Sequence, residues 1–413
     1  MDFNGVATWV TTHGATMITR LQVQNYKALH NVTLDLTPLH VLIGPNDTGK
    51  TSILEAMTAL CRSVDYPLSQ AFAGSWEGYD LVWQHTPDLP VSLRVEVEEE
   101  EQIQFEYQLS CTFAPSERTV RKHSEYFKHI KEAHTVDMSL GRITDSGVYS
   151  VSAKSAGSTY EQKVAVDLVY RALSSVHLYR WDPRMLSLPV APDAKHRFRM
   201  EVSGFGLALC LDDILGYDRS QFITLEQRLR DIFPQIKTIR LMQESAYRRP
   251  VDDSLQIPTL EQADGKGIYF ELMNGHQVPA SQTSDGVLLV LAYLTVLYLP
   301  PPYRPRVVLM EEPENGIHPK CLQDVLSILR DLVEEQTTSQ IILTTHSPYA
   351  LDLFKPEEVS LCHMTKDREV SLHRLSESRM VQEQIDIFTL GEIWTAEGDE
   401  ALISPDKSGE TTS

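Results

Sequence analysis

The stretch that most constrains this chain is GPNDTGKT, Gly44 to Thr51, which follows the apolar run LHVLI and precedes SILEAMTAL. A G-x-x-x-x-G-K-[ST] pattern between a strand and a helix is typical of a loop whose backbone N–H groups surround phosphates. The glycines let the backbone curl, and the N-terminus of the following helix adds positive potential. We therefore predict an α/β fold in which Lys50 reaches the β- and γ-phosphates of a nucleoside triphosphate. The predicted nucleotide-binding residues are Gly44, Asn46, Asp47, Thr48, Gly49, Lys50, Thr51 and Ser52.

Two adjacent carboxylates, Glu311 and Glu312, end a second apolar run, VVLM. Like charges repel, so this pair at the end of a buried strand is favourable only when positive groups lie opposite. We expect Glu311 and the Thr51 hydroxyl to hold Mg²⁺, and Glu312 to act as the general base that polarises the attacking water. The alternative is a solvated acidic loop end.

A third apolar run, QIILTT at 340–345, is followed by His346. A histidine at the end of a neighbouring strand is placed to contact the γ-phosphate, so we predict a catalytic role as donor and sensor. A lone histidine is otherwise more often structural.

Length and composition bound the protein class. The 413 residues allow two or three domain-sized units, and the net charge of -20 argues against a surface coated for nucleic acid. The five cysteines show neither paired nor metal-ligand spacing, which is typical of reduced thiols in a cytoplasmic protein. The longest apolar stretch, 287–299, is too short to span a bilayer, and no signal peptide precedes the first strand.

Hydrophobic periodicity predicts the order of the elements. We expect strands within 17–36, a hairpin at 91–113, strands at 175–179 and 238–242 around helices at 202–217 and 223–236, and a hairpin at the turn Asn274-Gly275. Helices follow at 287–299, 319–336 and 348–354, with strands at 306–311, 340–345, 359–363 and 370–375. The predicted units are a flexible leader (1–16), the first part of an ATPase head with a β subdomain (17–115), an insert that is mixed and then mainly helical (116–250), the second part of the head (251–380), and a C-terminal helix with a disordered tail (381–413).

Four motifs stand in order along the chain: GPNDTGKT, SDG (284–286), MEEPENGIHP (310–319) and TTHSP (344–348). With them, residues 17–375 resemble an ABC-type ATPase head of the RecF, SMC and OLD group. The resemblance implies ATP and Mg as cofactors and a homodimer in which two heads sandwich two ATP molecules. It assigns Ser284 and Gly286 to the γ-phosphate of the other subunit and Glu314 and Asn315 to a loop that crosses the dimer interface.

The sequence also departs from that family. The SDG motif is a reduced signature, Glu311 stands where aspartate is commoner, and the glutamine of the Q-loop is either Gln70 or Gln84. The 233 positions between Thr51 and Ser284 (284 − 51) carry no heptads, so long coiled-coil arms are not expected. This layout is nearest to RecF and the compact RecF-like ATPases of bacterial defence and repair.

OLD-type nucleases add a metal-binding TOPRIM domain after the head. Only ten residues follow TAEGDEALI (395–403), so we expect a helix end there and no nuclease domain.

The function that these features predict is an ATPase whose ATP-dependent dimerisation gates DNA binding or a partner effector, in DNA repair or anti-phage defence. The alternative is a regulatory scaffold with little turnover that controls a separately encoded nuclease or toxin. A transporter energiser is disfavoured by the long insert and the lack of membrane helices. Three basic clusters have two possible interpretations, a DNA-contacting surface or an ordinary ion-paired surface. The clusters are Arg118, Arg121, Lys122 and His123, then 195–200, and then Arg248 and Arg249, with the aromatic residues Phe198 and Tyr247 interleaved.

Overall fold

The computed structural model describes residues 16–72, 78–83, 89–99, 103–113, 120–131, 134–141, 160–192, 197–249, 260–334 and 340–403. Residues 1–15 of the predicted leader, the predicted tail after residue 403, Gln84, and the basic residues Arg118, Lys195 and His196 lie outside these ranges.

A main sheet of six strands forms the centre of the molecule, in the order β15-β14-β3-β13-β12-β8. All neighbouring pairs are parallel except β14 and β15. The strands are β3 (Leu39–Ile43), β8 (Val176–Tyr179), β12 (Val307–Glu311), β13 (Gln340–Thr344), β14 (Val359–Met364) and β15 (Val370–Arg374). The apolar runs of the sequence become its buried inner strands because helices cover both faces. The predicted α/β class is confirmed.

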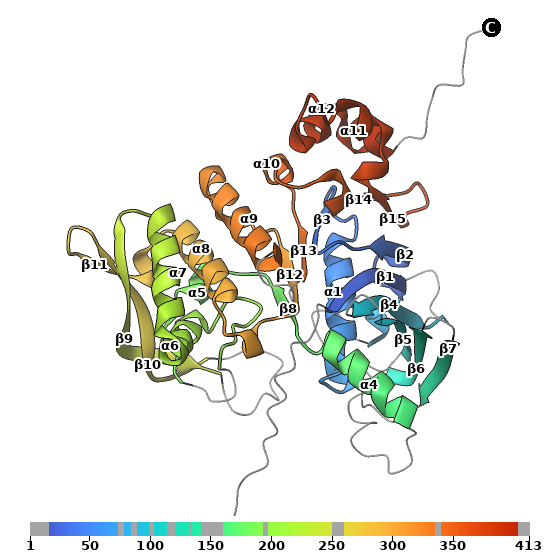
Figure 1. Cartoon of the computed structure of the whole chain (residues 1–413), viewed down its shortest axis with the longest axis horizontal. Helices are drawn as coiled ribbons and strands as arrows, with labels where there is room; N and C mark the ends of the chain where they lie inside the picture. Colours follow the sequence, from blue (N-terminus) through green and yellow to red (C-terminus); the bar gives the residue numbers. More distant parts are fainter. Residues whose placement is uncertain are drawn as a thin grey trace, which may run out of the picture.

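A second sheet, antiparallel and in the order β2-β1-β4-β5-β6-β7, packs over the helix that follows the phosphate loop (Figure 1). Its strands are β1 (Thr16–Tyr26), β2 (Leu29–Asp35), β4 (Val91–Glu99), β5 (Ile103–Phe113), β6 (Val120–Lys131) and β7 (His134–Gly141). The helices of this half are α1 (Lys50–Arg62), α2 (Leu68–Ala71) and α4 (Tyr160–Leu173), and a 3-10 turn covers Gly78–Leu81. Leu54, Met57 and Leu60 of α1 share one apolar core with Leu93 and Tyr107 of this sheet.

The predicted hairpin at 91–113 is confirmed as β4 and β5. The expected insert boundary at residue 116, in contrast, separates β5 from β6, which pair along most of their length. Sequence alternation is weak in β6, VRKHSEYFKHIK, because charged residues occur at both odd and even positions of the segment. The strand at 176–179 likewise belongs to the main sheet, where it pairs with β12.

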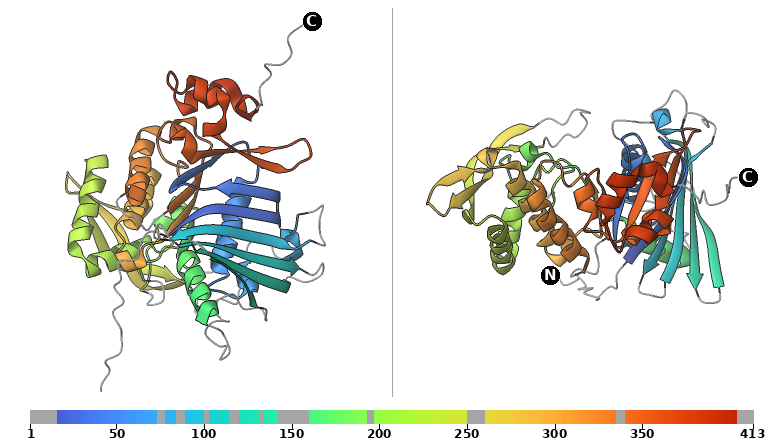
Figure 2. Two further views of the ribbon diagram at one scale, coloured as in Figure 1. Left: turned by 45° about the vertical axis from the view of Figure 1, so that its right-hand side comes forward. Right: turned by 90° about the horizontal axis from the view of Figure 1, so that it is seen from above.

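The other half contains a three-stranded sheet and the helices packed on it (Figure 2). Its elements are α5 (Pro183–Leu186), α6 (Leu207–Tyr217), α7 (Arg219–Ile232), β9 (Ile236–Arg248), β10 (Glu261–Leu272), β11 (Gln277–Pro279) and α8 (Asp285–Leu297). Helix α9 (Pro319–Glu334) packs between α8 and strand β13 of the main sheet. Asp218 caps α7, where its carboxylate accepts bonds from the backbone N–H groups of Ser220 and Gln221. The turn at Gly275, with φ of 84°, confirms the predicted hairpin between β10 and β11.

The C-terminal helices lie beside the main sheet, next to β14 and β15 (Figure 1). They are α10 (Pro348–Leu351), α11 (Arg379–Gln384) and α12 (Leu390–Ile403), which is kinked at Gly398. Residues 395–403 therefore end a helix, as predicted. Within the described residues, each helix is too short or too polar to cross a membrane. All five cysteines are free thiols.

Candidate functional site

Three parallel strands end at one edge of the main sheet and bring the separate motifs together. In the β-sheet register, Leu42 of β3 pairs with Thr344 of β13, which pairs in turn with Glu311 of β12. The phosphate loop, the Glu311–Glu312 pair and His346 each begin within two residues of these positions. The carboxyl end of a parallel sheet is where such folds bind ligands.

The phosphate loop adopts a conformation that depends on its glycines. Gly44 has φ of 133°, and a Cβ there would lie 2.1 Å from the carbonyl oxygen of Cys362. Gly49, the N-cap of α1, has φ of 85°. Both positions therefore exclude larger residues.

Lys50 points back into its own loop, where Nζ donates to the carbonyl oxygens of Gly44 (2.8 Å) and Pro45 (2.6 Å). Burial lowers its pKa, while nearby negative charges, among them Glu312 and Asp47, oppose that shift. Among the described residues, the ammonium group donates to carbonyl oxygens only.

The remaining loop residues differ in exposure. Asn46, Asp47 and Thr51 are exposed, Ser52 is half-buried, and Thr48 is buried with its hydroxyl donating to Pro45 O at 2.8 Å. The Thr51 hydroxyl is thus open to solvent at the start of α1.

Glu311 is nearly buried, with a side chain 12% exposed, and forms an ion pair with Arg180 through Oε2. Its other oxygen, Oε1, is buried and has no hydrogen-bond partner among the described residues. A buried carboxylate oxygen without a donor is costly unless a cation or water meets it. This orphaned oxygen fits Mg²⁺, which typically takes one or two protein oxygens and completes its shell with phosphate and water. No group of three His, Cys, Asp or Glu side chains among the described residues would hold a metal alone.

Glu312 occupies strained backbone, with φ of 45°. Its N–H donates to Thr344 O at 3.1 Å, and its carboxylate lies 3.3 Å from His346 Nε2 and accepts a bond from Asn315 Nδ2. The side chain is 37% exposed, so a water molecule can reach it. The two adjacent carboxylates therefore lie in different environments. Glu311 is nearly buried and pairs with an arginine, whereas Glu312 is more exposed and lies beside a histidine.

Glu314 and Asn315 form contacts within the chain. Glu314 accepts from Thr345 Oγ1 at 2.6 Å and from the backbone N–H of His346 at 3.0 Å, which fixes the loop that carries the histidine. Asn315 is exposed and holds Glu312.

Ser284 is the N-cap residue of α8 and is exposed, and its side chain makes no capping hydrogen bond. Gly286 is half-buried, and a Cβ there would meet nothing within 4 Å. Helix α8 is anchored to the loop after β12, because Tyr293 Oη donates to Pro313 O at 3.2 Å.

Other predicted residues lie elsewhere. Gln70 lines a separate cavity together with Arg199, Arg248 and Arg249, while Arg197 pairs with Asp213 at 3.2 Å. Arg121, Lys122 and His123 fall on β6. Sequence reasoning missed Arg180. This residue directly follows the predicted strand 175–179, but no sequence pattern indicates that this strand borders β12.

Comparisons with known proteins agree with this arrangement. A family model described as "AAA ATPase domain" matches residues 17–166, and one described as "AAA domain, putative AbiEii toxin, Type IV TA system" matches residues 207–352. An OLD nuclease from Thermus scotoductus is 41% identical over 56 residues, which are 14% of this chain and 10% of that protein. The match thus spans about a tenth of the relative's length.

Solved structures of SMC heads also match. An SMC head bound to the C-winged helix domain of ScpA is 13% identical, covering 86% of this chain and 97% of that one, with a TM-score of 0.46. An SMC head with an extended coiled coil, bound to the C-terminal domain of ScpA from Pyrococcus furiosus, is 11% identical, covering 90% and 100%, with a TM-score of 0.44.

The two family models and the P-loop edge of the main sheet define an AAA-type ATPase protein. Within that class, the order of the four motifs and the partial OLD match support a similarity to ABC-type ATPase heads of the RecF and OLD group.

Proposed function

We propose that the chain binds ATP with Mg²⁺ at the loop Gly44–Thr51 and hydrolyses it with Glu312 as general base. The observation that carries this proposal is the register that brings β3, β12 and β13 to one edge, with Glu312 3.3 Å from His346. Lys50 exchanges its carbonyl partners for β- and γ-phosphate oxygens, and the backbone N–H groups at the start of α1 face the phosphates.

Magnesium, when bound, neutralises the charge on the phosphates, and Glu311 Oε1 with the Thr51 hydroxyl would hold it. Glu312 accepts the proton of the attacking water, oriented by Asn315 and by His346. His346 donates toward the γ-phosphate when Glu312 turns to the water. Glu314 fixes the backbone of the histidine, so loss of Glu314 would disturb the position of His346.

The proposal includes a homodimer with shared sites. Ser284 presents an uncapped, exposed hydroxyl beside the free N–H groups of α8, which is the chemistry that recognises an anion. In the dimer, Ser284 and Gly286 of one subunit contact the γ-phosphate in the other.

The cycle of closing and opening gates DNA or a partner effector in DNA repair or anti-phage defence. The partial match to an OLD nuclease and the toxin-system description of one family model support an effector of this kind. The second candidate is a regulatory scaffold with little turnover. The ion pair between Arg180 and Glu311 favours it, because the arginine already neutralises the carboxylate that would hold the metal.

ATP turnover of the purified chain, measured with and without DNA, separates the two. We expect turnover that needs Mg²⁺ and is stimulated by DNA, and we expect Lys50→Ala to abolish ATP binding in calorimetry. The matched control is Arg379→Ala, at an exposed i,i+4 pair with Glu383, which should bind and hydrolyse ATP normally. Wild-type affinity in Lys50→Ala would refute the phosphate-loop assignment, and ATP binding without turnover would favour the scaffold.

A further inference from the structure

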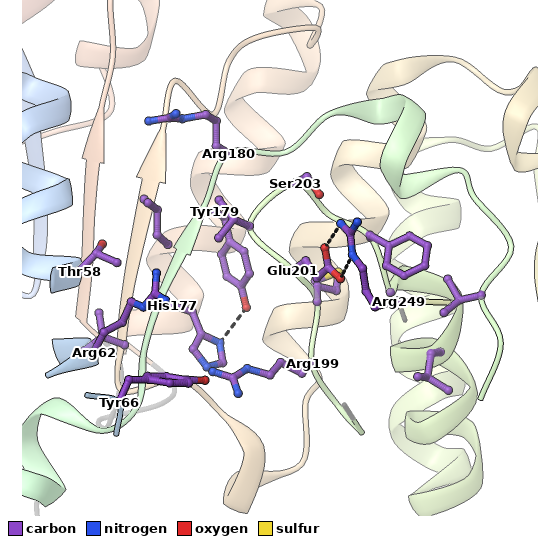
Figure 3. Close-up of a pocket in the computed structure, with 18 of the residues that line it drawn as sticks. Thr58, Arg62, Tyr66, His177, Tyr179, Arg180, Arg199, Glu201, Ser203 and Arg249 are labelled. Carbon is purple, nitrogen blue, oxygen red and sulfur yellow. Dashed lines mark hydrogen bonds and ion pairs between the residues drawn. The ribbon is translucent and has the colours of Figure 1, made fainter. Parts of the chain in front are cut away.

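A cavity of about 790 Å³ lies beside the main sheet, along the outer edge of strand β8. Its walls come from the last turns of α1 and the residues after it, from β8, from residues 199–209 and from the end of β9 (Figure 3). The volume lies within the range of sites that enclose a small ligand. None of the phosphate-loop residues 44–51 lines it.

The lining is strongly basic although the chain carries a net charge of -20. Five arginines line the cavity, against Glu201 as the one carboxylate in the lining; they are Arg62, Arg180, Arg199, Arg248 and Arg249. Two parts of the sequence that formed separate basic clusters, 197–200 and Arg248-Arg249, therefore meet here with α1.

Two of these arginines form no ion pair with a described carboxylate, in contrast to the other three. Arg180 pairs with Glu311, Arg248 with Glu261, and Arg249 with Glu201. Among the residues that the structure describes, no carboxylate forms an ion pair with Arg62 or Arg199. Burial raises the pKa of the nearby Asp65, and the positive charge of Arg199 partly opposes that shift. Two guanidinium groups in one cavity that form no ion pair with the described carboxylates are suited to a bidentate anion such as phosphate.

Aromatic and neutral polar groups stand beside these charges. The Arg62 guanidinium lies 5.4 Å from the centre of the Tyr66 ring, a cation–π arrangement on a partly exposed ring. His177 bonds Tyr179 Oη through Nδ1 at 3.1 Å, and burial together with the charge of Arg199 lowers its pKa to about 4. His177 is therefore neutral at pH 7 and can donate or accept a hydrogen bond. Figure 3 shows Arg62, Tyr66, His177 and Arg199 at one end of the cavity.

We propose that this cavity binds a nucleoside phosphate, free or as the 5′ end of a nucleic-acid strand, with Arg62 and Arg199 on the phosphate and the Tyr66–Arg62 stack against the base. Arginine and aromatic planes together are typical of sites that hold a base and its phosphate. An acidic peptide would use the arginines but gain little from the aromatic surface. The site shares no phosphate-loop residue with the proposed ATPase site, although Arg180 lines the cavity and pairs with Glu311.

The test is fluorescence anisotropy of a 3′-labelled 12-nucleotide single strand with a 5′-phosphate, added to the full chain in EDTA without ATP. Arg62→Ala and Arg199→Ala should each weaken binding by about tenfold. Arg379→Ala, at an exposed pair outside the cavity, should bind as wild type. Lys50→Ala should also bind as wild type, which separates this site from the phosphate loop. Thermal melts of each variant show whether it is folded.

Competitors identify the source of the phosphate. Displacement of the probe by a nucleoside monophosphate, and not by the nucleoside, indicates a free nucleotide site; binding that needs the 5′-phosphorylated strand itself indicates a strand end. The proposal is overturned if folded Arg62→Ala and Arg199→Ala bind probe and monophosphate as wild type does, if wild type binds neither, or if a poly-glutamate peptide competes as well as the nucleotide.

Discussion

Replacement of Arg180 by alanine is the sharpest perturbation of the site. Its guanidinium is half exposed, but its partner Glu311 is only 12% exposed and has a second oxygen that already lacks a donor. Removing one partner of a fully buried ion pair costs about 3–5 kcal/mol. Because Arg180 is half in solvent, we expect Arg180→Ala to lower the free energy of unfolding by about 1–3 kcal/mol.

Urea denaturation without nucleotide measures this loss. Mg²⁺ with a non-hydrolysable ATP analogue should recover most of it, because a cation then meets the carboxylate. The Mg²⁺ concentration for half-maximal binding of the analogue should also fall, since no arginine competes for Glu311. Arg379→Ala, which removes an exposed pair, should change stability by no more than about 0.5 kcal/mol. If Arg180→Ala is as stable as wild type and insensitive to Mg²⁺, the account of Glu311 as a metal-poised carboxylate is wrong.

Three further predictions concern catalysis, the loop and pH. Glu312→Gln should trap ATP and slow its hydrolysis by about 10²–10⁴-fold in single-turnover assays, because the amide cannot accept the proton of water; unchanged hydrolysis would remove Glu312 as the base. Gly44→Ala should destabilise the fold by about 3 kcal/mol or more, because φ is 133° there and the new Cβ would lie 2.1 Å from Cys362 O. The control Gly216→Ala, in helix α6 with open space around it, should be neutral or stabilising. Equal melting temperatures of the two variants would contradict this prediction. Burial lowers the pKa of His40 to about 3, so the folded state binds fewer protons than the unfolded state between pH 3 and 6.5, and stability is lost as pH falls through that window. Between pH 6.5 and pH 5, the free energy of unfolding of His40→Gln should therefore fall by about 2 kcal/mol less than that of the wild type, as measured by urea titration. If the unfolding free energies of both proteins depend on pH with the same slope, this contribution of His40 is excluded.

The sequence could predict the strands and loops whose pattern is local. The run LHVLI before GPNDTGKT and the runs before Glu311 and His346 became β3, β12 and β13, because buried parallel strands are apolar throughout. Their mutual register follows from the P-loop arrangement, so the edge at which they meet was predictable as well. The roles of Ser284, Gly286, Glu312 and His346 stay predictions that the proposed mutants test.

What the sequence could not predict are the contacts between distant elements. Arg180 and Glu311 are 131 positions apart (311 − 180), and their pairing depends on the placement of β8 next to β12. Strand β6 gave no clear alternation because its charged residues stand at both odd and even positions. The cavity joins α1 with residues 199–209, so the position of Gln70 in its wall, far along the chain from Arg249, follows only from the fold.

The central claim, that two subunits build each ATPase site, is tested most directly by mixing two inactive variants. Ser284→Arg should bind ATP but fail to hydrolyse it, and Glu312→Gln should bind ATP without turnover. A hybrid dimer of the two contains one site with both lesions and one with neither. With random mixing at equal concentrations, the account predicts recovery of about a quarter of wild-type activity, because half of the dimers are hybrids with one intact site. Hybrid dimers that form, as shown by differently tagged subunits, but recover no hydrolysis would contradict shared sites.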